Sequence, residues 1–276
     1  GENVGTYNIA LGSGAKASNY NISFDTNNQA MSITARPVYI SANSGQAKVY
    51  GEADPVLAST VQAKAANSGL LGTDGVSLTG TLTRASGEDA ANNYAIGQGS
   101  IATGSTNYNI VYAGANFAIT PRPITLSADS ATKVYGNANP AYSVSITSGS
   151  LPSAAVSDSL SDVTGILSRA AGENVGTYNI ALGSGAKASN YNISFDTNNQ
   201  AMSITQRPIT ITASSGQSKV YGDADPIALS YGVESNTVGR GLMNGDAFTG
   251  RLSRAAGEGV GNSYAINQGT LANGNY

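Results

Sequence analysis

A block of 34 residues occurs twice in this chain without a single change. Residues 1–34 and 172–205 are identical, which places the two copies 171 positions apart. Shorter strings recur at half that distance: Lys-Val-Tyr-Gly starts at residues 48, 133 and 219, and Arg-Pro starts at residues 36, 122 and 207. A fixed period of about 85 residues indicates a tandem array of one small unit, built by gene copying, rather than one large core.

The Arg-Pro pairs divide the chain into four predicted segments. Residues 1–36 are the C-terminal part of a repeat, 37–121 and 122–206 are complete repeats, and 207–276 are the N-terminal part of another. Proline removes a backbone donor and stiffens the chain, which suits a short rigid link. No long Gly/Ser linker separates the repeats, so we expect neighbours to touch. Each part-repeat lacks strands of a complete copy, and we expect it to fray or to pair with a neighbouring chain unless the protein continues past both ends of this sequence.

Hydropathy within a repeat alternates with a period of two, which is typical of strands with one buried face. In three copies of one segment the inward position holds Leu82, Leu167 or Leu252, and the outward position before it holds Thr81, Ile166 or Arg251. The predicted strands are residues 78–84, 163–169, 178–182, 191–195, 201–205, 209–212 and 248–254. Many short strands between Gly, Asn and Ser turns predict an all-β fold of β-sandwich-like modules. The Ala-rich residues 58–67 leave a short helical turn open as an alternative to strand or loop.

Composition removes several classes of function. The 276 residues include no Cys, no His and no Trp, which excludes disulfides, thiolate nucleophiles, a Ser-His-Asp triad and histidine-held metals. Only 11% of residues are charged and the net charge is −3, so the chain has no basic patch for nucleic acid. No membrane-spanning run is visible in the sequence. We therefore expect no enzyme activity, no cofactor, no metal site and no nucleic-acid partner.

Several motifs resemble a known family. They are KVYGDADP at residues 219–226, LTRASGE at 82–88, GTYNI at 176–180 and FAITPRPIT at 117–125. Together they resemble the mostly β, glycine-rich (MBG) repeats of large bacterial surface adhesins similar to filamentous haemagglutinin, over essentially the whole chain. The resemblance implies an extracellular protein at the bacterial cell surface in which such repeats form the stalk. The middle copy departs from the pattern, because residues 136–140 read Gly-Asn-Ala-Asn-Pro without the acids.

The loop after Lys-Val-Tyr-Gly carries acidic side chains in two copies, namely Glu52 and Asp54, and Asp223 and Asp225. One interpretation is a Ca²⁺ site, because hard cations take several oxygen ligands. The other is an Asx-type turn, in which a short polar side chain bonds nearby backbone before Pro. Asn137 and Asn139 in the middle copy keep the turn chemistry without the charge, so we predict the turn.

Two further sets of charged residues recur. Arg and Glu flank a tight turn as Arg84 and Glu88, Arg169 and Glu173, and Arg254 and Glu258. Glycoside hydrolysis needs two carboxylates facing one bond, and each repeat offers one recurring Glu here, so we predict an ion pair at a hairpin tip. Lys48, Lys133 and Lys219 come before a strand, where a lysine is usually solvated, so they are predicted to be solvated. The alternative for these lysines is a Lys–Asn cross-link formed beside a buried acid.

The chain has 15 tyrosines, and most recur at strand positions. The recurring sets are Tyr50, Tyr135 and Tyr221; Tyr7, Tyr94, Tyr178 and Tyr264; and Tyr20, Tyr108 and Tyr191. One apolar face and one hydroxyl suit the rim of a small core, and residues 176–178 resemble a tyrosine corner. Tyr39, Tyr112, Tyr142 and Tyr231 do not recur in every copy, which makes them the better candidates for surface contact such as glycan stacking.

These observations favour a non-catalytic stalk or spacer in a secreted adhesin or biofilm-matrix protein, with neighbouring repeats as its partners. Modules joined end to end predict a rod of about 110–130 Å, with a radius of gyration of about 32–38 Å against about 19 Å for a compact domain. The alternative is a set of weak binding modules that grip glycans or other surface proteins and add avidity.

Overall fold

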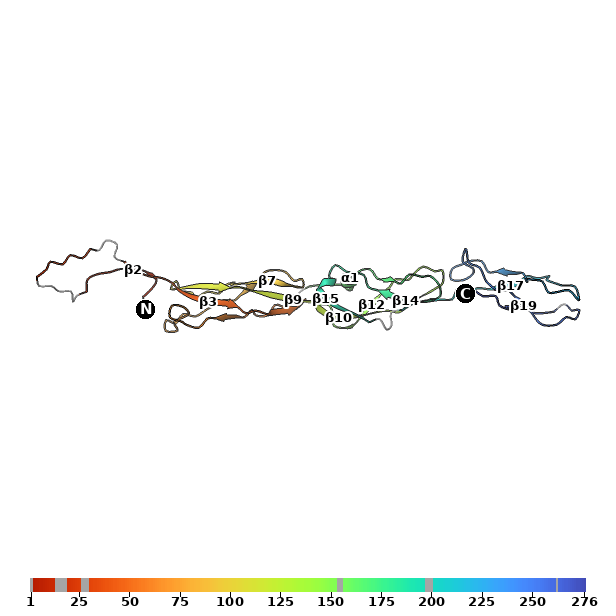
Figure 1. The fold of residues 1–276 in the computed structure, drawn as a ribbon, viewed down its shortest axis with the longest axis horizontal. Helices are drawn as coiled ribbons and strands as arrows, with labels where there is room; N and C mark the ends of the chain where they lie inside the picture. The colour runs from red at the N-terminus through yellow and green to blue at the C-terminus, as the bar shows by residue number, and fades with distance from the viewer. Residues whose placement is uncertain (1, 13–18, 26–29, 153–155, 197–200, 262) are drawn as a thin grey trace. The chain divides into compact units, whose positions relative to one another are not determined.

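The computed structural model describes residues 2–12, 19–25, 30–152, 156–196, 201–261 and 263–276. Two compact units are present, and each is described by itself. Unit 1 comprises Gly1–Arg122, Pro152–Ser157 and Ser189–Tyr191, and unit 2 comprises Pro123–Leu151, Asp158–Ala188 and Asn192–Tyr276. Most regular structure is β, which confirms the predicted all-β class; within the described ranges the helices are α1 (Leu160–Thr164) and the 3₁₀ turn η1 (Ala188–Asn190) (Figure 1).

The complete repeat of unit 1 contains two sheets. One has three strands in the order β5-β3-β8, and the other has four strands in the order β4-β9-β7-β6. The bounds are β3 (Arg36–Ala42), β4 (Gln46–Val49), β5 (Ser59–Val61), β6 (Thr83–Arg84), β7 (Ala91–Gly97), β8 (Tyr108–Ala113) and β9 (Ala115–Thr120). Both sheets are mixed, because β8 runs parallel to β3 and β9 runs parallel to β4.

The burial of β3 shows why these residues form a strand. Val38 and Ile40 are buried on one face, whereas Tyr39 between them is exposed. The core beneath this face adds Tyr108 from β8, with Leu78 and Tyr112 packed against it. The alternation of apolar and polar residues is therefore the alternation of inward and outward side chains.

The N-terminal part of unit 1 is a separate two-stranded ladder. In it β1 (Gly5–Asn8) pairs antiparallel with β2 (Ala30–Ile33), with Gly5 opposite Ile33 and Tyr7 opposite Met31. The same register occurs in unit 2, where the identical sequence places Gly176 opposite Ile204.

Unit 2 contains the same pair of sheets, with strand orders β12-β10-β15 and β11-β16-β14-β13. The bounds are β10 (Arg122–Ala128), β11 (Ala131–Val134), β12 (Val144–Ser148), β13 (Ser168–Arg169), β14 (Gly176–Ala181), β15 (Tyr191–Asp196) and β16 (Ala201–Thr205). Side chains of both sheets meet in one core that contains Ala128, Val144, Ile180, Met202 and Ile204. This two-sheet packing is the sandwich-like module that the alternation predicts.

The last part of unit 2 has shorter ladders. β17 (Ile211–Ala213) pairs with β18 (Tyr231–Val233), and β19 (Ser253–Arg254) pairs with β20 (Ile266–Asn267). The predicted strands at residues 178–182, 191–195 and 201–205 correspond to β14, β15 and β16 and are confirmed. The strand predicted at residues 209–212 is shifted, because β17 spans Ile211–Ala213.

Three predicted strands are shorter than expected. Of residues 78–84 only Thr83 and Arg84 join a ladder, because Gly80 has a φ of 87° and a Cβ there would lie 2.2 Å from the carbonyl oxygen of Ser100. Residues 248–254 are likewise reduced to β19, in which Gly250 has a φ of 79°. In residues 163–169 the start is helical, because Val163 lies in α1, where a capping box joins Ser159 to Asp162.

The predicted orientation of these segments is nevertheless correct. Leu82 and Leu252 are buried and Leu167 packs against the core, whereas Ile166 is 90% exposed. The helical alternative for residues 58–67 is wrong: Ser59–Val61 forms β5, because β-branched Thr60 and Val61 pair with β3. In the part of the chain that the structure describes, no helix is long and apolar enough to cross a membrane.

Candidate functional site

Each repeat holds two cations and two acceptors in a closed ring, called here the ion-pair ring. In the first complete repeat it joins Lys48 of β4, Asp54 of the following loop, Arg84 of β6 and Glu88 of the next turn. Lys48 Nζ lies 2.6 Å from Asp54 and 2.5 Å from Glu88, and Arg84 lies 2.7 Å from Asp54 and 2.6 Å from Glu88. The ring therefore ties the loop after β4 to the turn after β6.

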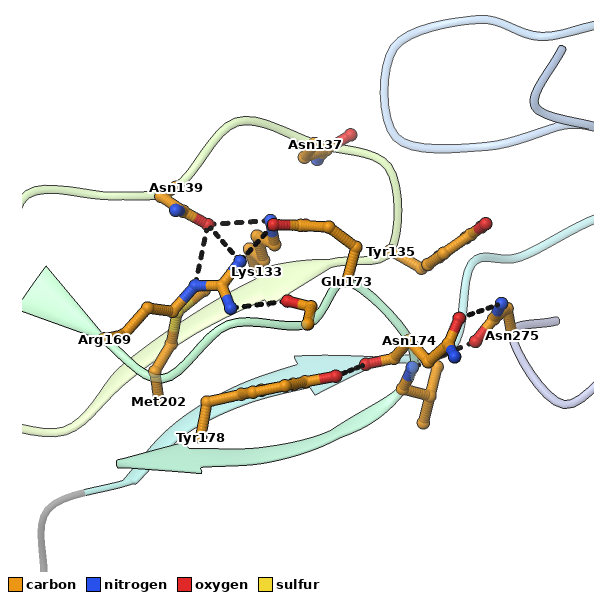
Figure 2. A network of polar contacts seen from close by, with 12 residues as sticks. Lys133, Tyr135, Asn137, Asn139, Arg169, Glu173, Asn174, Tyr178, Met202 and Asn275 are labelled. Carbon is orange, nitrogen blue, oxygen red and sulfur yellow. Dashed lines mark hydrogen bonds and ion pairs between the residues drawn. The ribbon is translucent and has the colours of Figure 1, made fainter. Parts of the chain in front are cut away.

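The second repeat builds the same ring with one neutral member. Figure 2 shows Lys133, Asn139, Arg169 and Glu173 converging from separate segments. Lys133 Nζ donates to Asn139 Oδ1 at 2.7 Å and to Glu173 at 2.5 Å, and Arg169 donates to both partners of the lysine. Asn139 occupies the position of Asp54, so the ring needs an oxygen acceptor there and tolerates the loss of its charge.

The third repeat has the ring in a more open form. Lys219 lies 3.0 Å from Asp225 and 2.5 Å from Glu258, and Arg254 contacts both carboxylates. The Lys219 side chain is 20% exposed, against 3% for Lys48. The shielding of this lysine is therefore incomplete in the third repeat.

The ion-pair ring favours the ionised form of its carboxylates and of Lys48. Burial opposes the charge on Lys48, but hydrogen bonds to Asp54 and Glu88 outweigh it, so the pKa of Lys48 is raised above its usual value. Hydrogen bonding to Arg84 lowers the pKa of Asp54, and hydrogen bonding to Lys133 lowers the pKa of Glu173. In the first repeat, therefore, Lys48 is held in its protonated form and Asp54 in its ionised form, and both groups are engaged in bonds between segments.

In the second repeat, a tyrosine and a glycine pack against the arginine of the ion-pair ring. Arg169 Cζ lies 4.9 Å from the ring centroid of Tyr178, and Nη1 of Arg169 donates to the carbonyl oxygens of Ala170 and Gly172. Gly172 has a φ of 131°, and a Cβ there would lie 2.4 Å from Tyr178 Cε1. Glycine is thus the residue that lets the tyrosine lie flat against the turn.

The tyrosine hydroxyl closes the turn from the other side. Tyr178 donates to the carbonyl oxygen of Asn174 at 2.7 Å, and Tyr7, Tyr94 and Tyr264 make the equivalent bond to Asn3, Asp89 and Gly259. Four copies with one geometry confirm the predicted tyrosine corner and the structural role of this recurring set.

The ion-pair ring tests two predictions made from the sequence, the Arg–Glu pair and the acidic loop. The Arg–Glu pair at the hairpin tip is confirmed in all three copies. The acidic loop is more than a turn, because Asp54, Asn139 and Asp225 bond the lysine and arginine of their own ring. Among the described residues no group of three or more Asp and Glu side chains could hold a metal ion.

The prediction of solvated lysines is wrong for two of three copies. Lys48 and Lys133 are buried, because each lies in a strand whose parallel neighbour covers it: Lys48 is opposite Ile119 and Lys133 is opposite Ile204. The period-two pattern alone could not show the burial of these lysines. A lysine is expected to be solvated unless its counter-ions are known, and the pattern does not locate them. The recurrence of Lys, Arg, Glu and an oxygen-bearing residue at fixed offsets was the available signal.

A second recurring contact joins consecutive repeats within each unit and is called here the repeat joint. In unit 2, Asn275 Oδ1 accepts from the backbone N–H of Val175 at 2.9 Å, and its Nδ2 donates to Asn174 Oδ1 at 3.1 Å (Figure 2). In unit 1, Asn107 makes the same two bonds to Val4 and Asn3. Asn190, also in unit 1, makes them to Ala90 and Asp89.

The Arg-Pro motif belongs to the same joint in unit 2. Arg207 is 2% exposed, and its guanidinium donates to the carbonyl oxygen of Tyr135 at 3.0 Å and to Asn137 Oδ1 at 3.2 Å. The same guanidinium also donates to the carbonyl oxygens of Thr237, Arg240 and Gly241 in its own repeat. Tyr135 packs edge-on against Tyr276, with ring centroids 5.7 Å apart. The expectation that neighbouring repeats touch is confirmed within the unit.

The non-recurring tyrosines do not form a common surface. Tyr112 and Tyr142 pack against the two cores, and Tyr142 also contacts the sulfur of Met202. Tyr39 is exposed and Tyr231 is half-buried. The structure therefore leaves Tyr39 as the most accessible of the four predicted contact residues.

One family matches most of the chain. The family described as MBG domain (YGX type) matches residues 38–118, 124–200 and 209–276, in three consecutive copies. No curated protein and no solved structure matches the chain.

Proposed function

Since this chain belongs to the MBG domain (YGX type) family, with three copies in tandem, we propose that it is a non-catalytic spacer. In this proposal the array is part of a secreted adhesin or biofilm-matrix protein at the bacterial cell surface. It holds a distal binding domain away from the cell, and its partners are the neighbouring repeats of the same chain.

The repeat joint is the observation that carries the proposal. A spacer must resist bending at each link, and the joint supplies directional contacts in place of a free linker. Arg207 reaches both repeats of unit 2 while almost fully buried, and Asn275 bonds the preceding repeat at two points. Directional hydrogen bonds fix an angle better than apolar contact alone, because each one is lost when the link rotates.

The ion-pair ring supports the same proposal. Each ring joins a loop and a turn that lie far apart in sequence, as Lys48 and Glu88 do across 40 positions. All four members are engaged with one another, so the ring offers no free nucleophile and no free acid. The repeats thereby gain resistance to opening without a disulfide.

Solution scattering tests the proposal. We expect a radius of gyration of about 32–38 Å for the 276-residue chain, because stiff links keep the repeats from collapsing on one another. A value of about 19 Å would contradict a spacer, and it would favour weak multivalent binding of glycans or other surface proteins. Binding of the chain to a glycan array tests that alternative. Tyr39→Ala is the variant, because it removes the most accessible of the four predicted contact tyrosines.

The joint itself is tested by a variant. Arg207→Ala removes six hydrogen bonds, four to backbone carbonyls and two to the side chains of Asn137 and Asn236. The link should therefore bend more freely, and the scattering curve should shift toward a broader distribution of distances. Arg251→Ala is the matched control, because Arg251 is an exposed arginine of the same repeat. An unchanged distance distribution in Arg207→Ala would show that the joint does not set the stiffness.

A further inference from the structure

The dipeptide Asn-Gly occurs twice in this sequence, as Asn244-Gly245 and as Asn273-Gly274. An asparagine before glycine is prone to deamidation, because glycine has no Cβ to keep its backbone nitrogen away from the side-chain amide carbon. Two identical dipeptides in one folded chain allow the effect of structure on this reaction to be separated from the effect of sequence.

Asn244 lies in an exposed tight turn. The N–H of Asp246 donates to the carbonyl oxygen of Met243 at 3.2 Å, so Asn244 and Gly245 are the two central residues. Gly245 has a φ of 91°, which favours glycine at this position of a turn, and nothing lies within 4 Å of a Cβ built on it. Both central residues are exposed, and neither makes a hydrogen bond within the described ranges.

Asn273 is followed by the same residue but has a restrained side chain. Its Nδ2 donates to the carbonyl oxygen of Ala247 at 2.9 Å, and its Oδ1 accepts from the N–H of Asn275 at 3.0 Å. Asn273 is also half-buried. Its amide carbon cannot turn to meet the nitrogen of Gly274 and become tetrahedral without disturbing both bonds, whereas no bond holds the Asn244 side chain.

The loop that contains Asn244 has a counterpart in the first complete repeat. There Tyr108 donates from its hydroxyl to Asp74, and the N–H of Leu71 donates to that hydroxyl at 3.2 Å. The two residues between Leu71 and Asp74 are exposed. They correspond to Asn244 and Gly245, so the exposure of this turn is a property of the repeat itself.

We propose that Asn244 is a site of spontaneous deamidation, with water as the other reactant. The backbone nitrogen of Gly245 passes its proton to solvent and forms a bond with Cγ of Asn244, while Nδ2 takes up a proton and leaves as ammonia. One water molecule then adds to the cyclic imide and opens it at either carbonyl carbon. The products are aspartate and isoaspartate, and in isoaspartate the main chain runs through the side-chain carboxyl group.

The turn that carries this site belongs to the contact between two repeats of unit 2. Asp246, its last residue, accepts from the hydroxyl of Tyr276 at 2.6 Å and from the hydroxyl of Tyr135 in the preceding repeat at 3.3 Å. Met243, its first residue, covers Gly136 of the preceding repeat, because a Cβ there would lie 2.6 Å from the methionine sulfur. A change within the turn is therefore transmitted to the repeat joint.

Both products disturb this contact. A carboxylate at position 244 adds a second negative charge two residues from Asp246, and like charges repel. Isoaspartate also lengthens the main chain of the turn by one carbon, so the N–H of Asp246 no longer meets the carbonyl oxygen of Met243 in the same geometry. The joint between the second and third repeats therefore loosens as the chain ages.

Peptide mapping by mass spectrometry tests the site. The 276-residue chain is aged folded in warm, mildly alkaline buffer and digested afterwards. The peptide with Asn244 should gain the mass difference between a hydroxyl and an amino group, and it should separate into aspartate and isoaspartate forms. The peptide with Asn273 should react at least about tenfold more slowly, because two hydrogen bonds hold its amide. Equal rates at the two asparagines in the folded chain would overturn the proposal.

The unfolded chain is the matched control. In concentrated urea the hydrogen bonds of Asn273 are lost, so both asparagines should react at similar rates. A difference that persists in urea would show that sequence rather than structure selects the site, contrary to the proposal. An Asn244 that stays intact in the folded chain, over the time that the unfolded chain needs to react, would overturn it as well.

Amide exchange tests the effect on the joint. The N–H of Met243 donates to the hydroxyl of Tyr276 at 2.9 Å, and it should exchange faster in the aged chain than in the fresh one. Asn244→Ser cannot deamidate and should keep the fresh rate after the same ageing. Asn244→Asp adds the charge without isoaspartate, so its rate should lie between the two.

Unchanged exchange at Met243 in a chain that has fully reacted would overturn the loosening of the joint. None of these measurements depends on the spacer function, because mass and amide exchange report the modification directly. Scattering of the Asn244→Ser chain, which cannot age at this site, tests the spacer function separately.

Discussion

Lys133 donates a 2.7 Å hydrogen bond from its Nζ atom to Oδ1 of Asn139. Glu173 lies beside them, so an amine, an amide and an acid are in contact, as a Lys–Asn cross-link would require (Figure 2). Attack of the amine on the amide carbon would release ammonia, and it needs a neutral lysine and a protonated acid. Hydrogen bonding to Lys133 lowers the pKa of Glu173, and Arg169 also bonds this carboxylate, so the protonated acid that the reaction needs is disfavoured.

We therefore expect no cross-link in the second repeat, and the intact mass should equal that of the sequence. High-resolution mass spectrometry of the purified chain measures this. A mass lower by one ammonia, restored in Lys133→Arg, would show that the bond forms. Lys48 with Asp54 is the internal comparison, because the same reaction there would release water.

The ion-pair rings should make the fold sensitive to acid. Hydrogen bonding to Lys133 lowers the pKa of Glu173 from its usual 4.5, so the unfolded chain binds a proton at a pH where the folded chain does not. This stabilisation is present above pH 4.5 and is lost as the pH falls through the folded pKa. Thermal melts should therefore show a lower midpoint at about pH 3 than at pH 7.

Two variants check the origin of this acid sensitivity. Glu173→Gln should reduce the difference between the melting midpoints at the two pH values, whereas Ile166→Thr, at an exposed position that carries no titratable group, should leave it unchanged. An equal response of both variants would contradict a role for the ring.

Gly172→Ala should destabilise the second repeat by about 1–3 kcal/mol, the usual cost of a strained backbone conformation. The backbone has a φ of 131°, and the new Cβ would lie 2.4 Å from Tyr178 Cε1. Chemical denaturation measures the change. Gly12→Ala is the control, because nothing lies within 4 Å of a Cβ at that glycine.

Leu82→Ala should cost about 2–5 kcal/mol of unfolding free energy, because it leaves a cavity in the core. Ile166→Thr should be nearly neutral, since Ile166 is exposed and the other copies carry Thr81 and Arg251 at this position. Denaturant melts of the two variants rank the two effects. The reverse ranking would mean that the inward and outward faces have been exchanged.

The sequence was a good guide to the fold wherever copies could be compared. Exchange of Thr81, Ile166 and Arg251 at one position revealed a solvated face, and the Leu residues beside them revealed the core. Which strands pair could not be predicted from the sequence, because the parallel ladders β4–β9 and β11–β16 join residues about 70 positions apart. Local glycine geometry was also invisible, so the strand at residues 78–84 was expected to be longer than Thr83–Arg84.

The candidate site could be predicted only in part. The Arg84–Glu88 pair is local and followed from spacing, whereas Lys48 and Asp54 enter through tertiary contacts that no local pattern specifies. The repeat joint was missed for a related reason. Asn107, Asn190 and Asn275 are ordinary polar residues in the sequence, and their shared role is visible only from the backbone groups that they bond.

The repeat joint requires few specific groups from the preceding repeat. Its asparagine contact needs only a backbone N–H and one side-chain oxygen from that repeat, and Asn3, Asp89 and Asn174 each supply the oxygen. Repeats with diverged surfaces are therefore interchangeable as neighbours, and unequal crossing-over can insert or delete one without creating a mismatched boundary. The length of such an array can then change in whole-repeat steps while each boundary keeps the same asparagine contact, so copy number alone adjusts how long the array is.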